Sequence, residues 1–392
     1  MLALVAYFPK VDFLRITLLP FAAIAALLLT AVPLRADIID VWLGTGTNQP
    51  DQGIFHCTLN TENGRLSAPR VVAQIIRPGF LAMHPSQPVL YAVGTLEKTP
   101  CVAAYRITAT GRNASLELLN SVPIGDGGAA HVAVNDAGTM LTTAQYGGGS
   151  VAVFSLQSSG AVGKRTQLVE HGVGSKVVAG RQDTAHAHWV GYSPDQRFLF
   201  VPDLGLDKVM IYECDSDGGR IQQHGAGVVP PGAGPRHMKF HQNGQWVYVL
   251  NELDLSVTLF RYNKAEGTMT AAQTVATVPK TELAKEKFKS CSEIRVHPNG
   301  RYVYAANRGH DTITVFSVHP ATGELTVVER EHVRGATPRN FNIAPDGRWL
   351  LAAGQHSHTL ACFEVNPDSG ELTYNREVVH APSCICVLFG HE

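Results

Sequence analysis

Charged side chains of opposite sign stand at the two ends of one short hairpin pattern. Arg236 and His237 begin a predicted strand that an Asn-Gly turn follows, and Asn251 and Glu252 end the next strand. Antiparallel strands joined by a short turn bring the start of the first beside the end of the second. We therefore expect Arg236 and Glu252 to meet, where they could bind an anion and move a proton. An isolated pair would equally serve as a structural salt bridge.

The same arrangement recurs along the chain with a period of about 50 residues. Each unit has a strand, a turn rich in Pro, Asp, Asn or Gly, a second apolar strand, a polar loop and a third alternating strand. In most units a fourth strand follows Gly219, Gly267, Gly323 or Gly370. Four strands at such a period are typical of propeller blades. The units contain residues 81–94, 131–156, 188–213, 237–262, 294–318 and 341–365.

Two terminal pieces complete the count of blades. Residues 40–66 have the later strands of a blade but lack its first, and residues 383–389 form a lone apolar strand. Joining the two ends in one blade would close the ring and remove free sheet edges. The sequence therefore predicts an all-β, seven-bladed propeller over residues 37–392, closed by its N- and C-terminal strands. A solenoid or a double sandwich is the alternative architecture.

Residues 1–36 have the order of a secretory signal peptide. Lys10 and Arg15 precede a long apolar run, and the small residue Ala36 precedes Asp37. Positive charge, apolar stretch and small residue at the cut define such a signal. We expect export to the periplasm or the extracellular space, and no stable membrane insertion after cleavage. An uncleaved anchor or a mis-assigned start codon are the alternatives.

Composition narrows the choice of partner. The chain has 32 Lys and Arg residues against 33 Asp and Glu residues, so it shows no electrostatic footprint for nucleic acid. A small-molecule partner is expected. The seven cysteines are odd in number and scattered, which predicts buried thiols rather than a disulfide framework. His186 and His188 could share a face and hold a metal, but no third ligand has a recognisable spacing, so we expect neither metal nor cofactor.

Blade geometry predicts which polar residues meet. The first strand of a blade lines the central channel, so the start of strand one and the end of strand two lie on one rim. The opposite rim carries turn formers, which makes the polar rim a candidate pocket. Long connections at 165–184 and 278–290 could cover it or be solvated decoration. The residues expected to be neighbours on this rim are, blade by blade, His131 with Tyr146; His186 and His188 with Asp203; Arg236 and His237 with Asn251 and Glu252; Glu293 with Asn307 and Arg308; and Arg339 with Asn340 and Gln355.

Several segments together resemble the seven-bladed lactonase family, which includes bacterial 6-phosphogluconolactonase of the propeller type and fungal carboxy-muconate cyclase. The similarity covers essentially everything after residue 36. It implies lactone chemistry near His188, Arg236, Glu252 and Arg308. Residues 92–95 read AVGT where relatives often carry Asn-Glu. The segments are GTGT (44–47), QYGGGSVAVF (145–154), residues 186–212, GPRHMKFH (234–241), VLNEL (249–253), residues 292–318 and residues 338–358.

The leading hypothesis is hydrolysis of a sugar lactone that is anionic or sugar-derived. Arg236 and Arg308 would hold an anionic group or the oxyanion, and either His188 or Glu252 would accept the proton of water. The alternatives are a muconate-type lactonising cyclase and an exported propeller that binds a ligand or protein without chemistry. The further candidate substrate contacts are His131, Tyr146, His186, His237, Asn251, Glu293, Asn307, Arg339 and Gln355.

Overall fold

The computed structural model describes residues 2–3, 6, 38–49, 52–215 and 219–390. The predicted signal sequence, residues 1–36, lies outside these residues apart from positions 2, 3 and 6. Within the described residues, no helix is both long and apolar enough to cross a lipid bilayer.

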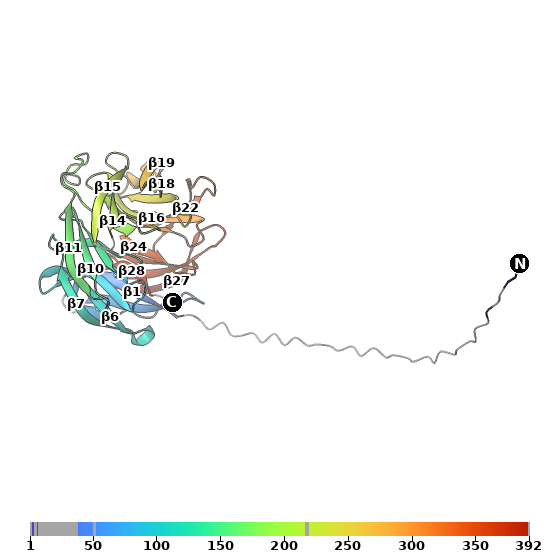
Figure 1. The fold of residues 1–392 in the computed structure, drawn as a ribbon, viewed down its shortest axis with the longest axis horizontal. Coiled ribbons are helices and arrows are strands. Elements are labelled where there is room, and N and C mark those ends of the chain that lie inside the picture. Colours follow the sequence, from blue (N-terminus) through green and yellow to red (C-terminus); the bar gives the residue numbers. More distant parts are fainter. Residues whose placement is uncertain (1, 4–5, 7–37, 50–51, 216–218, 391–392) are drawn as a thin grey trace. The chain divides into compact units, whose positions relative to one another are not determined.

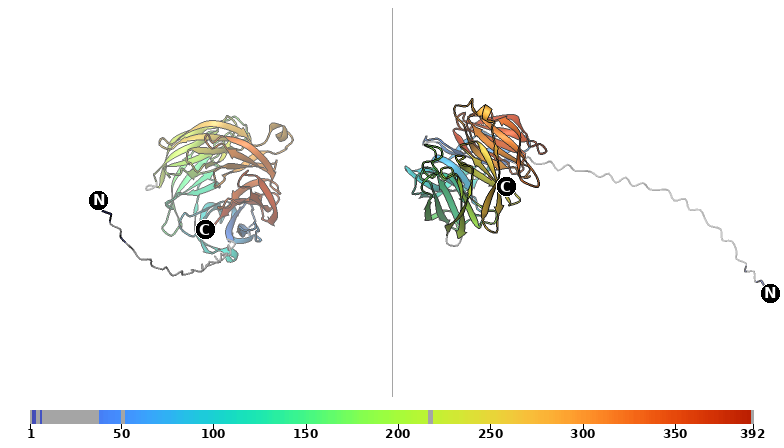
Figure 2. Two further views of the ribbon diagram at one scale, coloured as in Figure 1. Left: turned by 90° about the vertical axis from the view of Figure 1, so that its right-hand side faces the viewer. Right: turned by 90° about the horizontal axis from the view of Figure 1, so that it is seen from above.

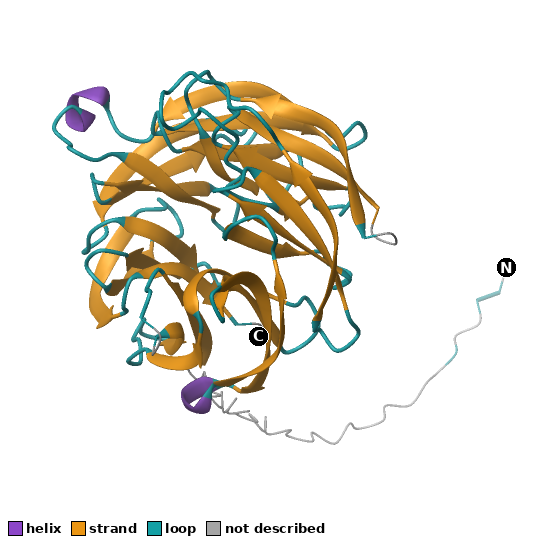
Figure 3. Ribbon diagram, turned by 90° about the vertical axis from the view of Figure 1, so that its left-hand side faces the viewer, coloured by secondary structure: helices purple, strands orange, loops and turns teal. Residues whose placement is uncertain are grey.

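The described residues between 38 and 390 form seven four-stranded antiparallel sheets, which confirms the predicted seven-bladed propeller (Figure 1). Inner strands of neighbouring sheets pack against one another around a closed ring. Figure 2 shows the sheets following one another in sequence order, with the blue N-terminal strands beside the red C-terminal ones. Two short helical turns, η1 (Gly111–Asn113) and α1 (Lys280–Leu283), lie in connections (Figure 3).

Each sheet runs from an inner to an outer strand. The first three contain β28 (Cys384–Phe389), β1 (Ile38–Thr45), β2 (Gly53–Asn60) and β3 (Arg70–Gln74); β4 (Ile76–Met83), β5 (Val89–Leu96), β6 (Thr99–Ala109) and β7 (Ser115–Pro123); and β8 (Ala129–Val134), β9 (Met140–Gln145), β10 (Ser150–Leu156) and β11 (Val162–Glu170). The next two contain β12 (Gly191–Tyr192), β13 (Phe198–Asp203), β14 (Lys208–Asp215) and β15 (Arg220–Val228); and β16 (Pro235–Phe240), β17 (Trp246–Asn251), β18 (Ser256–Asn263) and β19 (Thr268–Ala276). The last two contain β20 (Ser290–Val296), β21 (Tyr302–Arg308), β22 (Thr312–Val318) and β23 (Leu325–His332); and β24 (Pro338–Ile343), β25 (Trp349–Gly354), β26 (Thr359–Val365) and β27 (Leu372–His380).

The chain ends meet in one blade, as the two terminal pieces predict. β28 supplies its inner strand and pairs with β1 in antiparallel register, Val41 opposite Phe389 and Leu43 opposite Val387. β2 and β3 complete the sheet. This pairing covers the edge that each terminal piece would otherwise expose.

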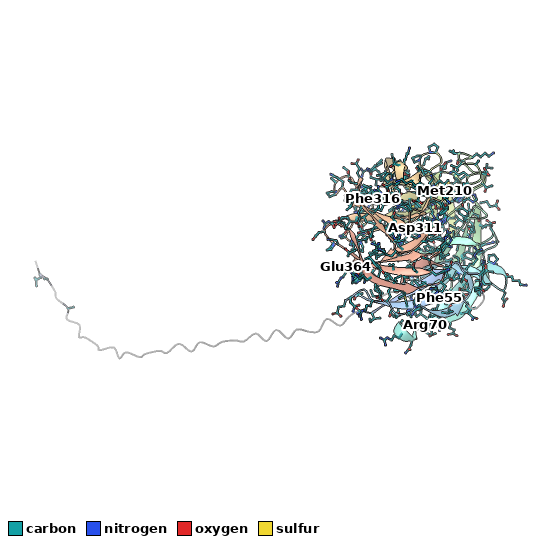
Figure 4. The ribbon with its side chains drawn as sticks, turned by 180° about the vertical axis from the view of Figure 1, so that it is seen from behind. Phe55, Arg70, Met210, Asp311, Phe316 and Glu364 are labelled. Carbon is teal, nitrogen blue, oxygen red and sulfur yellow. The ribbon has the colours of Figure 1, made fainter. Side chains whose placement is uncertain are left out.

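The middle strands are apolar on both faces because each sheet lies between two others. β17 and β25 are buried along their whole length, whereas in the outer strand β19 only Met269 is buried. Strands covered on both faces read as continuous apolar runs. Phe55, Met210 and Phe316, labelled in Figure 4, belong to three of the apolar clusters between sheets.

The recurring glycine before each fourth strand has a packing reason. Gly323 and Gly370 adopt φ of +72° and +77°, and a Cβ on either would meet the ring of Trp246 or Tyr302 in the preceding blade. Their carbonyls accept hydrogen bonds from the hydroxyls of Tyr248 and Tyr304, both at 2.8 Å. Only glycine tolerates both the conformation and the close approach.

Two expectations about connections need correction. Strand β11 continues to Glu170, so the first long connection begins at residue 171 rather than 165. His186 and His188 do not alternate along a regular strand, because β12 contains only Gly191 and Tyr192, and Ala187 makes an isolated bridge to Asp203. All seven cysteines are free thiols, and all except Cys214 are buried, as predicted.

Candidate functional site

A cavity of about 800 Å³ opens on the rim where first strands begin and second strands end. Its lining includes these candidate residues: Tyr146, His188, Arg236, His237, Glu252, Arg308, Arg339 and Gln355. The structure thus brings together the four residues that the family resemblance implies and four of the further candidates.

Bulges in the first strands aim two of the arginines into the cavity. Pro235 pairs with Asn251 and His237 with Leu250, so Arg236 is the extra residue of β16. Arg339 occupies the same position in β24, between Pro338 and Asn340. A bulge bends the strand and redirects a side chain, and such bulges are frequent next to active sites.

Glu252 is held by three arginines. Its Oε1 lies 2.6 Å from Nη2 of Arg181, and its Oε2 lies 2.9 Å from Nε of Arg236 and 3.1 Å from Nη2 of Arg308. Burial alone would raise the pKa of the Glu252 carboxyl, but the charges of Arg308, Arg236 and Arg181 outweigh it and lower the pKa. Glu252 is therefore an ionised anchor for the arginines, which confirms the predicted meeting of Arg236 and Glu252.

Arg236 and Arg308 are fixed by further contacts. Arg236 Nη1 donates to the carbonyl of Ser292 and, at 3.1 Å, to Nε2 of His237. Arg308 Nη2 donates to the carbonyl of Cys291 at 2.9 Å. Burial and then the charge of Arg308 lower the pKa of Arg236 to about 9, so its guanidinium remains cationic at neutral pH.

His188 faces this cationic group as a neutral base. It is 5% exposed, it lines the cavity, and its Nδ1 is buried without a hydrogen-bond partner among the described residues. Burial, followed by the charge of Arg236, holds the pKa of His188 well below its usual value. The imidazole is therefore unprotonated at neutral pH and available to accept a proton.

His237 and Glu293 form a support behind the lining. His237 Nδ1 lies 3.1 Å from Oε1 of Glu293, and its Nε2 accepts from Arg236. Since Arg236 only donates, His237 carries its proton on Nδ1 and donates a hydrogen bond from it to Glu293. Burial, then the charge of Arg236, keeps the pKa of His237 well below its usual range. Asn340 Nδ2 donates to the other oxygen of Glu293.

The remaining candidates lie behind the lining, so direct substrate contact by them stays a prediction. The rings of His131 and Phe80 lie 3.9 Å apart, and His186 stacks on Tyr146 with Nδ1 2.7 Å from its carbonyl oxygen. Asn251 and Asn307 donate instead to hydroxyls of the following strands, Asn251 to Ser256 and Thr258 and Asn307 to Thr312 and Thr314.

The sequence reasoning missed Arg77, Arg181 and Phe288 as lining residues. Arg181 lies in the connection that begins at residue 171, and Phe288 lies in the connection before β20. For Arg181 and Phe288, the position in a long connection was the available signal, whereas Arg77 lies in β4 and had none. The Phe288 ring stacks on the Arg308 guanidinium, whose Cζ lies 5.8 Å from the centre of that ring.

The cavity is strongly cationic. Of the described residues that line it, Arg77, Arg181, Arg236, Arg308 and Arg339 carry positive charge, against the single carboxylate of Glu252. Guanidinium groups bind carboxylates and phosphates in forked pairs. The arrangement can therefore hold an anion, stabilise developing negative charge and accept a proton at His188.

Comparison with known proteins shows similarity to one family along the whole propeller. Residues 40–389 match the family described as Lactonase, 7-bladed beta-propeller. The 6-phosphogluconolactonase of Bacillus subtilis is 34% identical over 300 residues, which are 76% of this chain and 83% of that protein. The 6-phosphogluconolactonase of Formosa agariphila is 31% identical over 311 residues, 77% of this chain and 86% of that protein. The structure of a periplasmic gluconolactonase from Pseudomonas aeruginosa superposes with a TM-score of 0.82 at 30% identity, covering 91% of this chain and 99% of that one.

Proposed function

The chain belongs to the seven-bladed β-propeller lactonase family, and we propose that it opens a sugar lactone by hydrolysis in the rim cavity. The observation that carries this proposal is the neutral, unpartnered imidazole of His188 beside the arginines that Glu252 holds. Ester hydrolysis requires a proton acceptor for water and positive charge at the carbonyl oxygen. The cyclase and non-catalytic alternatives are not favoured, because the named relatives are lactone hydrolases.

In the proposed reaction, His188 accepts a proton from the water that adds to the lactone carbonyl. Negative charge then develops on the carbonyl oxygen, and Arg236 and Arg308 stabilise it. The bond from the carbonyl carbon to the ring oxygen breaks, and His188 returns the proton to that oxygen. The products are the open-chain hydroxy acid and the enzyme in its original state.

Glu252 has a positioning function in this scheme. Both of its oxygens are engaged by arginines, and the lowered pKa makes it a poor proton acceptor. An anionic substrate would offset part of the arginine charge that depresses the pKa of His188. Substrate binding would therefore make His188 a stronger base when it is needed.

We also propose that residues 1–36 direct export and are removed. The order of positive charge, apolar run and small residue supports this, as does the likeness to a periplasmic gluconolactonase. Detecting the protein in a periplasmic or culture fraction, with its N-terminus at Asp37, would test it. Cell-bound protein that retains residues 1–36 would instead indicate an anchor.

The test of function is acid release above the spontaneous rate from 6-phosphogluconolactone and glucono-δ-lactone. We expect His188→Asn to lower kcat/KM by roughly 10²- to 10⁴-fold, the usual contribution of a general base. His224→Asn is a matched control, since His224 contacts only the carbonyl of Glu266 and the ring of Phe198 among the contacts described for it. Background rates with both lactones in the unaltered protein would contradict the proposal.

A further inference from the structure

Two arginines of the cavity differ from the other three in their partners. Arg181, Arg236 and Arg308 share Glu252. Arg77 and Arg339 also line the cavity, but no carboxylate within residues 38–49, 52–215 and 219–390 forms an ion pair with either. A guanidinium without a carboxylate in a cavity is free to take an anion from a ligand.

Backbone irregularities bring both arginines to the rim. Arg339 is the bulged residue of β24. Arg77 lies in a wider bulge of β4, where the register moves from Ile76 opposite Thr95 to Phe80 opposite Val93. Arg77 adopts φ of +50°, and its N–H donates to the carbonyl of Thr47 at 3.0 Å. The left-handed conformation and the hydrogen bond to Thr47 accommodate the bulge that brings Arg77 to the rim.

The backbone that leads to Arg339 is fixed by the preceding turn. Asp311, labelled in Figure 4, accepts a hydrogen bond from the N–H of Thr337 at 2.8 Å and so fixes the entry into β24. Burial and then the charge of Arg308 lower the pKa of Arg339 to about 10. Arg339 therefore remains cationic at neutral pH, and the cost of leaving it without an anion favours ligand binding.

The wall between the two arginines is built from small residues and a neutral donor. Gly46, Gly79 and Gln355 line the cavity here. A Cβ on Gly46 would stand 3.4 Å from Nε2 of Gln355 and 3.1 Å from Oγ of Ser383. A side chain at position 46 would thus press on Gln355 and Ser383 and disturb the wall that they form.

This part of the cavity lies across the channel from His188. Arg339 enters from the β24 blade and Arg77 from the β4 blade, and these two blades flank the closing blade of β28 and β1. His188 enters from the β12 blade, on the other side of the ring. A substrate whose carbonyl reaches His188 would direct its remote end toward Arg77 and Arg339.

We propose that Arg77 and Arg339, with the amide of Gln355, form an anion subsite for a phosphate monoester or carboxylate at the end of the substrate remote from the lactone carbonyl. The assignment of that end rests on the proposed function. Anion binding itself depends only on the arginines and can be measured without turnover.

The experiment measures calorimetric affinity for three hexoses that contain no lactone: glucose 6-phosphate, glucuronate and glucose. We expect the unaltered protein to bind at least one of the two anions more tightly than glucose. Arg339→Gln and Arg77→Gln should each weaken binding of that anion by about 10- to 100-fold, the range for a charge-assisted hydrogen bond. Arg348→Gln is the matched control, because Arg348 lies on an exposed turn and pairs with Glu364.

The results distinguish a phosphate subsite from a carboxylate subsite. A loss confined to glucose 6-phosphate identifies a phosphate subsite, and a loss confined to glucuronate identifies a carboxylate subsite. Equal affinity for all three sugars, or variants that behave like Arg348→Gln, would overturn the proposal. If Arg339→Gln fails to fold, the exposed Arg77→Gln still decides the question.

Lactone turnover on the same preparations keeps the two proposals apart. Anion binding that depends on Arg339 in a protein that hydrolyses no lactone would refute the proposed function and leave the subsite standing. Hydrolysis of lactones with anion affinity unchanged in both variants would refute the subsite alone.

Discussion

Glu252 and His188 are both proton acceptors by residue type, but their surroundings separate them. Both carboxylate oxygens of Glu252 form ion pairs, with Arg181, Arg236 and Arg308. Nδ1 of His188, in contrast, has no hydrogen-bond partner among the described residues. Arg308 and Arg236 lower the pKa of the carboxyl, whereas burial first and then the charges of Arg236 and Arg308 lower that of the imidazole. The arginines thus keep Glu252 ionised, and burial together with the same cations keeps His188 neutral.

This difference predicts the pH dependence of catalysis. Since the pKa of His188 is lowered, the acid limb of kcat/KM should lie below the ~6.5 of free imidazole. Glu252→Gln should lower kcat/KM by about 10- to 100-fold, the loss of one or two charge-assisted contacts, and keep that limb. The measurement is initial rate against pH between pH 4.5 and pH 7.5, corrected for spontaneous opening.

His188→Asn is the companion variant, and its residual activity should lose the limb. If Glu252→Gln removed the limb and His188→Asn kept it, the two assignments would have to be exchanged. Circular dichroism of both variants checks that the propeller is intact.

At the scale of elements, aspartates in the turns between second and third strands fix the entry of the next blade. Asp207 follows β13 and accepts from Gly232 N–H at 2.8 Å and Gly234 N–H at 2.9 Å, just before Arg236. Asp311 follows β21 and holds Thr337 in the same way, just before Arg339. Each turn thus positions the bulge that carries an arginine.

Asp207 also holds the connection that carries Arg181. Its Oδ1 accepts from Nε2 of Gln182 at 2.7 Å, and its Oδ2 accepts from Oγ of Ser175 at 3.1 Å. We predict that Asp207→Asn, which replaces one acceptor by a donor, lowers kcat/KM by about tenfold, the loss of one or two buried hydrogen bonds. Faster amide exchange in residues 172–186 should accompany it.

Asp346→Asn is the matched control on the opposite rim, where Asp346 accepts only from Arg348 N–H among the contacts described for it. We expect its kinetics to stay within about twofold of the unaltered protein, as for most surface changes. Unchanged exchange and kinetics in Asp207→Asn would show that the connection holds its position without the carboxylate.

These contacts explain which parts of the site the sequence could predict. The hairpin rule brings Arg236 to Glu252 because antiparallel pairing fixes which ends meet. The hairpin rule does not tell which of the residues at these strand ends point into the cavity. Asn251 and Asn307 lie at such ends, but their side-chain amides donate to hydroxyls of the next strand. Arg181 could not be assigned, because its connection lies outside the four-strand repeat and its position depends on distant Asp207.

At the scale of the whole propeller, the ring buries neutral histidines around its channel. His131, His188 and His237 are each at most 5% exposed, and their rings lie 5.2 to 5.7 Å from one another in two pairs. Burial is the main reason that the pKa of each is held well below its usual value. The folded ring therefore resists protonation of groups that the unfolded chain would protonate.

The sign of this linkage predicts acid sensitivity. In the unfolded chain these histidines bind protons near pH 6.5, so unfolding gains about 1.4 kcal/mol per histidine for each pH unit below that value. Stability should be nearly constant from about pH 7.5 to pH 6.5 and then fall toward about pH 5.5. Urea unfolding at these three pH values measures the effect. His131→Phe keeps a ring against Phe80 and Trp189 and should make the fall shallower. An unfolding midpoint that does not move with pH would mean that the three histidines bind protons as readily in the folded propeller as in the unfolded chain.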